Sequence, residues 1–133
     1  MKKLLLAVGL FLGTLVPAWA NETDIQSTIQ RQIDAFKADD FSTAFSFASP
    51  MIQGMFRSPD RFGQMVQQGF PMVHRPADVQ FQGLRDDQGL LIQRVLIRDT
   101  NGLFHTLDYQ MIEQDTGWKI NGVTFVQAPS VGA

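Results

Sequence analysis

The sequence contains no cysteine, and this absence excludes several kinds of site at once. Disulfide bonds, thiolate catalysis and zinc sites built on cysteine all require that side chain. Histidine is also scarce, because only His74 and His105 are present as imidazole ligands. No catalytic or nucleotide-binding motif occurs. The sequence therefore predicts no metal site and no cofactor, and it identifies no catalytic residue.

Positive charge is the second shortage. The chain has 11 lysines and arginines against 13 aspartates and glutamates, and two of the lysines lie at its extreme N-terminus. A protein that binds nucleic acid needs a basic face for the phosphate backbone. The rest of the chain has no run of basic residues, so we expect no nucleic-acid partner.

A hydrophobic segment near the N-terminus, Leu4 to Val16, is too short to span a bilayer, which takes roughly 20 residues. Two lysines precede it, Pro17 follows it, and the motif Ala18-Trp19-Ala20 has small side chains at the positions that signal peptidase requires. We therefore expect residues 1–20 to be a cleaved signal peptide. The remaining single domain, 21–133, would act in the periplasm or outside the cell, without membrane contact.

Apolar residues repeat at spacings of three and four through the first half of this domain, as they do in amphipathic helices. Polar residues that suit an N-cap precede each repeat. The predicted helices are 25–36 after Thr23, 41–48 after Asp39-Asp40, and 59–69 after Ser58. Pro50 is expected to stop or kink the second helix, and residues 70–76 are expected to form an extended connection.

Three turns of one form divide the second half: Asp86–Gly89, Asp99–Gly102 and Gln114–Gly117. Each has a polar residue first and glycine fourth, which is typical of a type I turn closed by a left-handed glycine bulge. Such turns fix the register of antiparallel hairpins. The predicted pairs are Val79 with Ile97, Phe81 with Val95, Gln93 with Tyr109, Arg94 with Asp108, Val95 with Leu107, Leu107 with Phe125, Tyr109 with Val123, and Glu113 with Lys119.

These registers send the odd-numbered strand residues to one face of the sheet. Most of them are apolar, so this face is expected to meet the helices. The apolar members are Val79, Phe81, Leu91, Val95, Ile97, Leu103, Leu107, Met111, Val123 and Phe125. The predicted fold is therefore α+β, with N-terminal helices packed on a curved antiparallel sheet of four strands.

Four short segments carry a resemblance to a known family. They are Ile33–Phe36, Phe45–Pro50, Tyr109-x-Met111 and Gly117–Val123. With these segments the chain resembles, from Ile25 to Val126, an exported bacterial family known as domain of unknown function 4864. Its layout is in turn similar to the nuclear transport factor 2-like cone, in which three helices and a bent sheet enclose a pocket. The resemblance implies this fold and a bacterial periplasm, and it carries over no catalytic residue.

The inward positions that are not apolar are the candidate ligand-binding residues, namely Gln93, His105, Tyr109 and Asn121. In the predicted register Gln93 lies beside Tyr109, and Asn121 lies diagonally across from it. Neutral polar groups within an apolar cavity are typical of a site for a small apolar or amphipathic ligand. The alternative, in which these groups satisfy one another or buried backbone groups, remains open.

Two other functions remain open. An enzyme that performs acid/base chemistry in the cone would need an inward carboxylate. No carboxylate is expected beside Tyr109 or His105, because Asp108 points outward to Arg94. His74 is a candidate for the mouth of the pocket. A homodimeric interaction module would instead use the outer face of the sheet, where an apolar patch is predicted from Leu84, Ile92, Ile112 and Ile120.

Overall fold

The computed structural model describes residues 18–127, and within this range five helices are followed by four strands. The helices are α2 (Ala18–Lys37), α3 (Phe41–Ser46), α4 (Pro50–Phe56), α5 (Pro59–Gly69) and α6 (Pro71–His74). The strands are β1 (Pro76–Asp87), β2 (Leu90–Asp99), β3 (Phe104–Gln114) and β4 (Gly117–Phe125). This order confirms the predicted α+β class. Most of the predicted signal peptide lies outside the described residues, and none of the described helices is long and apolar enough to cross a membrane.

The helix boundaries follow local capping chemistry. The predicted caps of α3 and α5 are confirmed, since Asp40 accepts a hydrogen bond from the Thr43 N–H at 3.2 Å and Ser58 accepts one from the Arg61 N–H at 3.2 Å. Thr23 is not a cap, because α2 begins five residues earlier.

Two prolines begin helices that the sequence did not predict. Ser49 caps a separate helix, α4, with Pro50 at the first helical position. The expected extended connection at 70–76 is wrong over its middle, where Pro71 opens the short helix α6. In both places proline occupies the first turn of the helix, where its missing N–H breaks no intrahelical hydrogen bond.

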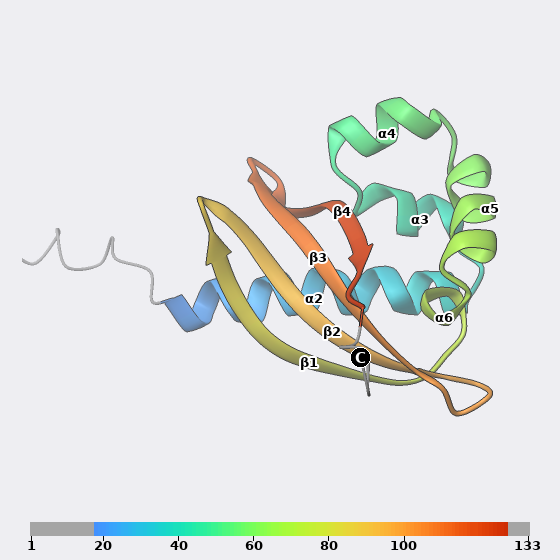
Figure 1. Ribbon diagram of the computed structural model, residues 1–133. Helices are drawn as coiled ribbons and strands as arrows, with labels where there is room; N and C mark the ends of the chain where they lie inside the picture. The colour runs from blue at the N-terminus through green and yellow to red at the C-terminus, as the bar shows by residue number, and fades with distance from the viewer. Residues whose placement is uncertain (1–17, 128–133) are drawn as a thin grey trace, which may run out of the picture.

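The four strands form one open antiparallel sheet in the order β1-β2-β3-β4. The sheet is curved, and α2 lies along its concave side with the shorter helices gathered near the C-terminal half of α2 (Figure 1). The core lies at this junction. Its fully buried members include Ile25, Ile29 and Ile33 of α2 and Val95, Ile97 and Leu107 of the central strands.

The middle hairpin has the predicted register along its whole length, including the pairs Gln93 with Tyr109 and Arg94 with Asp108. Its turn also has the predicted form, because the Gly102 N–H donates to the Asp99 carbonyl at 3.0 Å and Gly102 has a φ of +87°.

The first and third hairpins differ from the prediction near their turns. In the first, Gln88 and Gly89 both have positive φ, which is the geometry of a two-residue type I′ loop. The extra residue expected at the turn lies instead within β1, between Phe81 and Leu84. In the third hairpin the extra residue is Asn121, within β4. Beyond these bulges the predicted pairs are confirmed, but between bulge and turn the register is shifted by one residue.

This shift reverses which side chains face the core near the two turns. Leu84 pairs with the buried Gln93, and Ile120 pairs with the buried Met111. The predicted outer patch of Leu84, Ile92, Ile112 and Ile120 is therefore wrong for Leu84 and Ile120, which pack inward. The predicted pair of Glu113 with Lys119 is also wrong, because Glu113 pairs with Trp118. Among the predicted core residues, Leu103 and Phe125 are exposed.

Candidate functional site

A cavity of about 230 Å³ lies between the helices and the C-terminal half of the sheet. Thirteen of its fifteen lining residues carry no polar side-chain group, and four are phenylalanines. The lining consists of Gln32, Phe36, Ala48, Ile52, Met55, Phe56, Phe62, Met65, Val66, Phe70, Val73, Tyr109, Ile120, Gly122 and Val123. No charged side chain occurs among them.

Each wall of the cavity follows from the pattern of one element. Gln32 and Phe36 are four residues apart on α2, so they lie on one helix face. From α5, Phe62 packs its ring against the rings of Phe36 and Phe56, with centroids 5.7 Å apart in each pair. On α4, Met55 both lines the cavity and is 65% exposed, so the cavity reaches the surface there.

Tyr109 is the one candidate residue from the sequence that lines this cavity. Its side chain is fully buried, and its hydroxyl has no hydrogen-bond partner within the part of the chain that the structure describes. Burial raises the pKa of this phenol well above its usual range. The hydroxyl therefore stays protonated and is a hydrogen-bond donor rather than a base.

Gln93 lies beside Tyr109 as predicted, but its amide is already engaged. Its Nε2 donates to the Gln82 carbonyl at 2.7 Å and to the Arg94 carbonyl at 3.0 Å. Its Oε1 accepts a hydrogen bond from Gln26 Nε2 at 3.4 Å. Gln82 lies in the bulge of β1, so Gln93 satisfies a carbonyl that the interrupted ladder leaves without a strand partner.

Asn121 and His105 do not line the cavity. Asn121 is the extra residue of the β4 bulge. His105 lies at the start of β3, where its Nε2 is 2.8 Å from Asp99 Oδ2. The expectation that no carboxylate would contact His105 is therefore wrong.

The carboxylate of Asp99 belongs to the turn that it opens. Its Oδ1 accepts hydrogen bonds from the N–H groups of Asn101 and Leu103, each at 2.9 Å. The contact with His105 and the hydrogen bond from Leu103 lower the pKa of Asp99. Because one carboxylate holds both the turn and the imidazole, this pair stabilises the hairpin locally.

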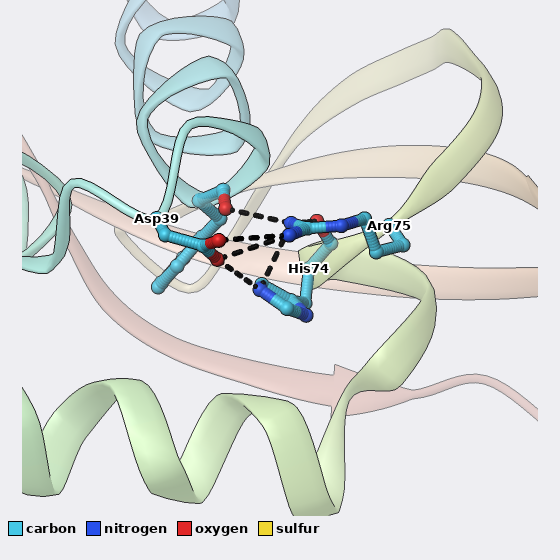
Figure 2. A network of polar contacts seen from close by, with 4 residues as sticks. Asp39, His74 and Arg75 are labelled. Atoms are coloured by element: carbon cyan, nitrogen blue, oxygen red, sulfur yellow. Dashed lines mark hydrogen bonds and ion pairs between the residues drawn. The ribbon is translucent and has the colours of Figure 1, made fainter.

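A second polar cluster joins the end of α2 to α6 (Figure 2). Arg75 Nη2 donates to both carboxylate oxygens of Asp39, at 3.1 and 3.0 Å, and His74 Nε2 lies 2.7 Å from Asp39 Oδ1. Arg75 Nη1 donates to the carbonyls of Phe36 and His74, which occupies both of its protons. His74 Nε2 also lies 2.9 Å from Arg75 Nη1, so the imidazole contacts both members of the Asp39–Arg75 ion pair.

The geometry of this cluster is that of a structural contact between two helices. Asp39 has a φ of +54°, a left-handed conformation that ends the turn after α2. The hydrogen bonds from His74 and Arg75 lower the pKa of Asp39. His74 does not line the cavity, although the neighbouring Val73 does, so the cluster fixes α6 against α2 behind the cavity wall. Among residues 18–127 no group of three or more acidic or histidine side chains could hold a metal ion.

On the outer face of the sheet, Asp108 accepts three hydrogen bonds from two arginines. Arg94 donates to both of its oxygens at 2.9 and 3.1 Å, as the predicted register requires, and Arg85 donates to Oδ2 at 2.9 Å. These contacts leave the Asp108 side chain 11% exposed on the face of the sheet opposite the described helices (Figure 1). They lower the pKa of Asp108 to about 2 from its ordinary value of 3.8, with Arg94 the largest cause.

Replacing Asp108 with asparagine is expected to lower the free energy of unfolding at pH 6 by about 1 to 2 kcal/mol, a range reduced because both arginines are partly exposed. A carboxylate with a lowered pKa stabilises the fold above the pKa of the unfolded state and loses this effect as the pH falls. The difference between wild type and variant should therefore disappear between about pH 4 and pH 2. Urea unfolding at pH 6 and pH 2.5 measures it, and a difference independent of pH would contradict the assignment.

The fold and the cavity together define an α+β domain in which helices and a curved sheet enclose an apolar space. The family model described as Domain of unknown function (DUF4864) matches residues 18–133. The chain belongs to this family, which confirms the resemblance seen in the sequence. No curated protein and no solved structure matches the chain.

Proposed function

We propose that this domain is a non-catalytic binding module that holds a small apolar or amphipathic ligand in the cavity. The observation that carries the proposal is the cavity itself, which has about 230 Å³ of space and a lining dominated by aromatic and aliphatic side chains. An apolar cavity of about 150 Å³ in another protein is large enough to bind benzene. The arrangement of helices over the sheet is also compatible with a nuclear transport factor 2-like cone.

The lining supports binding better than catalysis. General acid/base chemistry needs a group that titrates near the working pH. The cavity has no histidine or carboxylate among its lining residues, and the phenol of Tyr109 stays protonated. The two histidines are engaged elsewhere, His74 with Asp39 and His105 with Asp99.

Export is part of the same proposal. A short apolar segment, two preceding lysines and the Ala18-Trp19-Ala20 motif support a signal peptide over residues 1–20. The ligand would then be bound in the periplasm or outside the cell. N-terminal sequencing of the exported protein tests this step, since cleavage at the motif predicts Asn21 as the first residue, and a retained Met1 would contradict it.

Methionine methyl groups provide a direct test of the cavity. Met55 and Met65 line it, whereas Met51 is exposed on the same helix as Met55 and does not line it. We expect toluene to shift the ¹³C-methyl NMR signals of Met55 and Met65 in a saturable manner. The signal of Met51 should remain unchanged. Equal shifts at Met51 and Met55 would indicate non-specific association, and no shifts at all would contradict the proposal.

A further inference from the structure

We infer that the ligand of this cavity carries an uncharged hydrogen-bond acceptor, and that this acceptor binds the hydroxyl of Tyr109. The inference rests on the proposed function and specifies the chemistry of its ligand. The phenolic oxygen of Tyr109 is buried and has no hydrogen-bond partner among the described residues. Buried polar groups are nearly always hydrogen-bonded, so an unpartnered one requires an explanation.

The neighbouring polar side chains do not provide this partner. Gln93 lies directly across from Tyr109, but both protons of its amide and its carbonyl oxygen are engaged by Gln82, Arg94 and Gln26. Gln32, the other polar residue of the lining, donates to the Ala44 carbonyl at 3.1 Å, which holds its amide toward α3. The remaining lining residues have apolar side chains. The Tyr109 hydroxyl is itself closed off by its neighbours, so the acceptor of an occupant reaches its proton only after these neighbours move apart slightly.

The lining also limits the charge of the group that meets Tyr109. No lysine, arginine or histidine lines the cavity, so a carboxylate or phosphate placed there would be buried without a counter-ion. No acidic residue is available for an ammonium group either. Because an unpaired charge in an apolar site is strongly disfavoured, the acceptor has to be neutral, as in a ketone, ester, ether or alcohol.

A water molecule is the simplest other partner for the hydroxyl. A buried water typically makes two to four hydrogen bonds to protein groups. Tyr109 and Gln32 are the only polar side chains among the lining residues, and Gln32 is already turned toward Ala44. The cavity therefore suits an organic molecule with one polar group better than it suits isolated water.

Three probes of similar size separate these possibilities: acetophenone, which has a neutral acceptor; cumene, which is its hydrocarbon counterpart; and benzoate, which is charged at pH 7. Dissociation constants are measured for wild type and for Tyr109→Phe by titration of the Met55 and Met65 methyl signals. We expect Tyr109→Phe to weaken acetophenone about tenfold and to leave cumene unchanged. Benzoate should bind wild type at least about 100-fold more weakly than acetophenone.

A second measurement uses wild type alone, because Tyr109 is the single tyrosine of the chain. With ¹³C at Cζ, the protein gives one tyrosine signal, which should shift with acetophenone and not with cumene. This readout stays valid if Tyr109→Phe fails to fold.

The outcomes distinguish ligand binding in the cavity from the role of the Tyr109 hydroxyl. If no probe shifts Met55 and Met65, the proposed function is wrong. If cumene and acetophenone bind but respond equally to Tyr109→Phe, or leave the tyrosine signal unchanged, the cavity binds ligands without using the hydroxyl and the inference is overturned. Tight benzoate binding would contradict the conclusion that the acceptor is uncharged.

Discussion

Replacing Ile120 with aspartate is expected to destabilise the protein by about 4 kcal/mol, because the new carboxylate would be buried without a partner. Ile120 is 5% exposed, lines the cavity and pairs with Met111. Its backbone is also fixed, since its N–H donates to the Phe47 carbonyl at 2.9 Å and its carbonyl accepts from the Ser49 N–H at 2.8 Å. The strand cannot turn the side chain outward without breaking these bonds to the segment between α3 and α4.

The matched control is Ile112→Asp, on the neighbouring strand and on the opposite face. Ile112 pairs with Lys119, so the introduced carboxylate would lie beside a cation near water. We expect a change within about 1 kcal/mol. Urea unfolding of both variants gives the comparison, and equal losses would contradict the assignment of Ile120 and Ile112 to opposite faces of the sheet.

The same control variant tests the homodimer, which stays a proposal on a smaller patch. With Leu84 and Ile120 packed inward, the outer patch is reduced to Ile92 and Ile112 beside the Arg94–Asp108 pair. If this face joins two copies, Ile112→Asp should produce a folded monomer. Light scattering measures the mass, and a wild-type mass equal to that of one chain at tens of micromolar would contradict the dimer.

Replacing Gly63 with valine is expected to cost about 2 to 3 kcal/mol through overpacking. A Cβ atom at Gly63 would lie 2.6 Å from Cγ and Cδ2 of the Phe41 ring. The ring has little room to withdraw, because it packs against the rings of Phe36 and His74 with centroids 6.3 Å away in each case. The close approach of α5 to the start of α3 therefore depends on glycine at this position.

Gly54→Val serves as the comparison, since a Cβ atom at Gly54 on α4 would meet nothing within 4 Å. Valine has a slightly better helix propensity than glycine, so the variant should be neutral or stabilised by a few tenths of a kcal/mol. Thermal or urea unfolding separates the two variants. A similar loss at both positions would mean that helix propensity, and not the contact with Phe41, governs Gly63.

The sequence predicted the class of fold and the centre of the sheet because those depend on periodicity, which is local. It failed near the first and third turns, because turns of similar sequence do not all place the extra residue in the same position. Asp99–Gly102 places its extra residue at Gly102, whereas the first hairpin places it inside β1. The available signals were Gly83 in β1 and Gly122 in β4, because a glycine within a strand often marks a bulge.

The candidate site was predictable only in part. Tyr109 followed from its face of the sheet, whereas the cavity depends on how far the helices stand from the strands, which no local pattern encodes. Five of the lining residues come from α4 and α6 or from the residues directly before them, and the sequence did not predict either helix. The contact of Asp39 with His74 joins positions 35 residues apart and likewise has no signature in the sequence.

The bulges also affect the two edges of the sheet. Because the strand order is β1-β2-β3-β4, β1 and β4 each have one side without a neighbouring strand, and on that side of β4 the backbone of Ile120 bonds to Phe47 and Ser49. A regular edge of this kind is a template for pairing with another chain, and natural proteins often interrupt it. Here each edge strand carries such an interruption, at Gln82-Gly83 in β1 and at Asn121 in β4. The residues that redirect Leu84 and Ile120 into the core thus also break the continuous ladder that aggregation into an extended sheet would require.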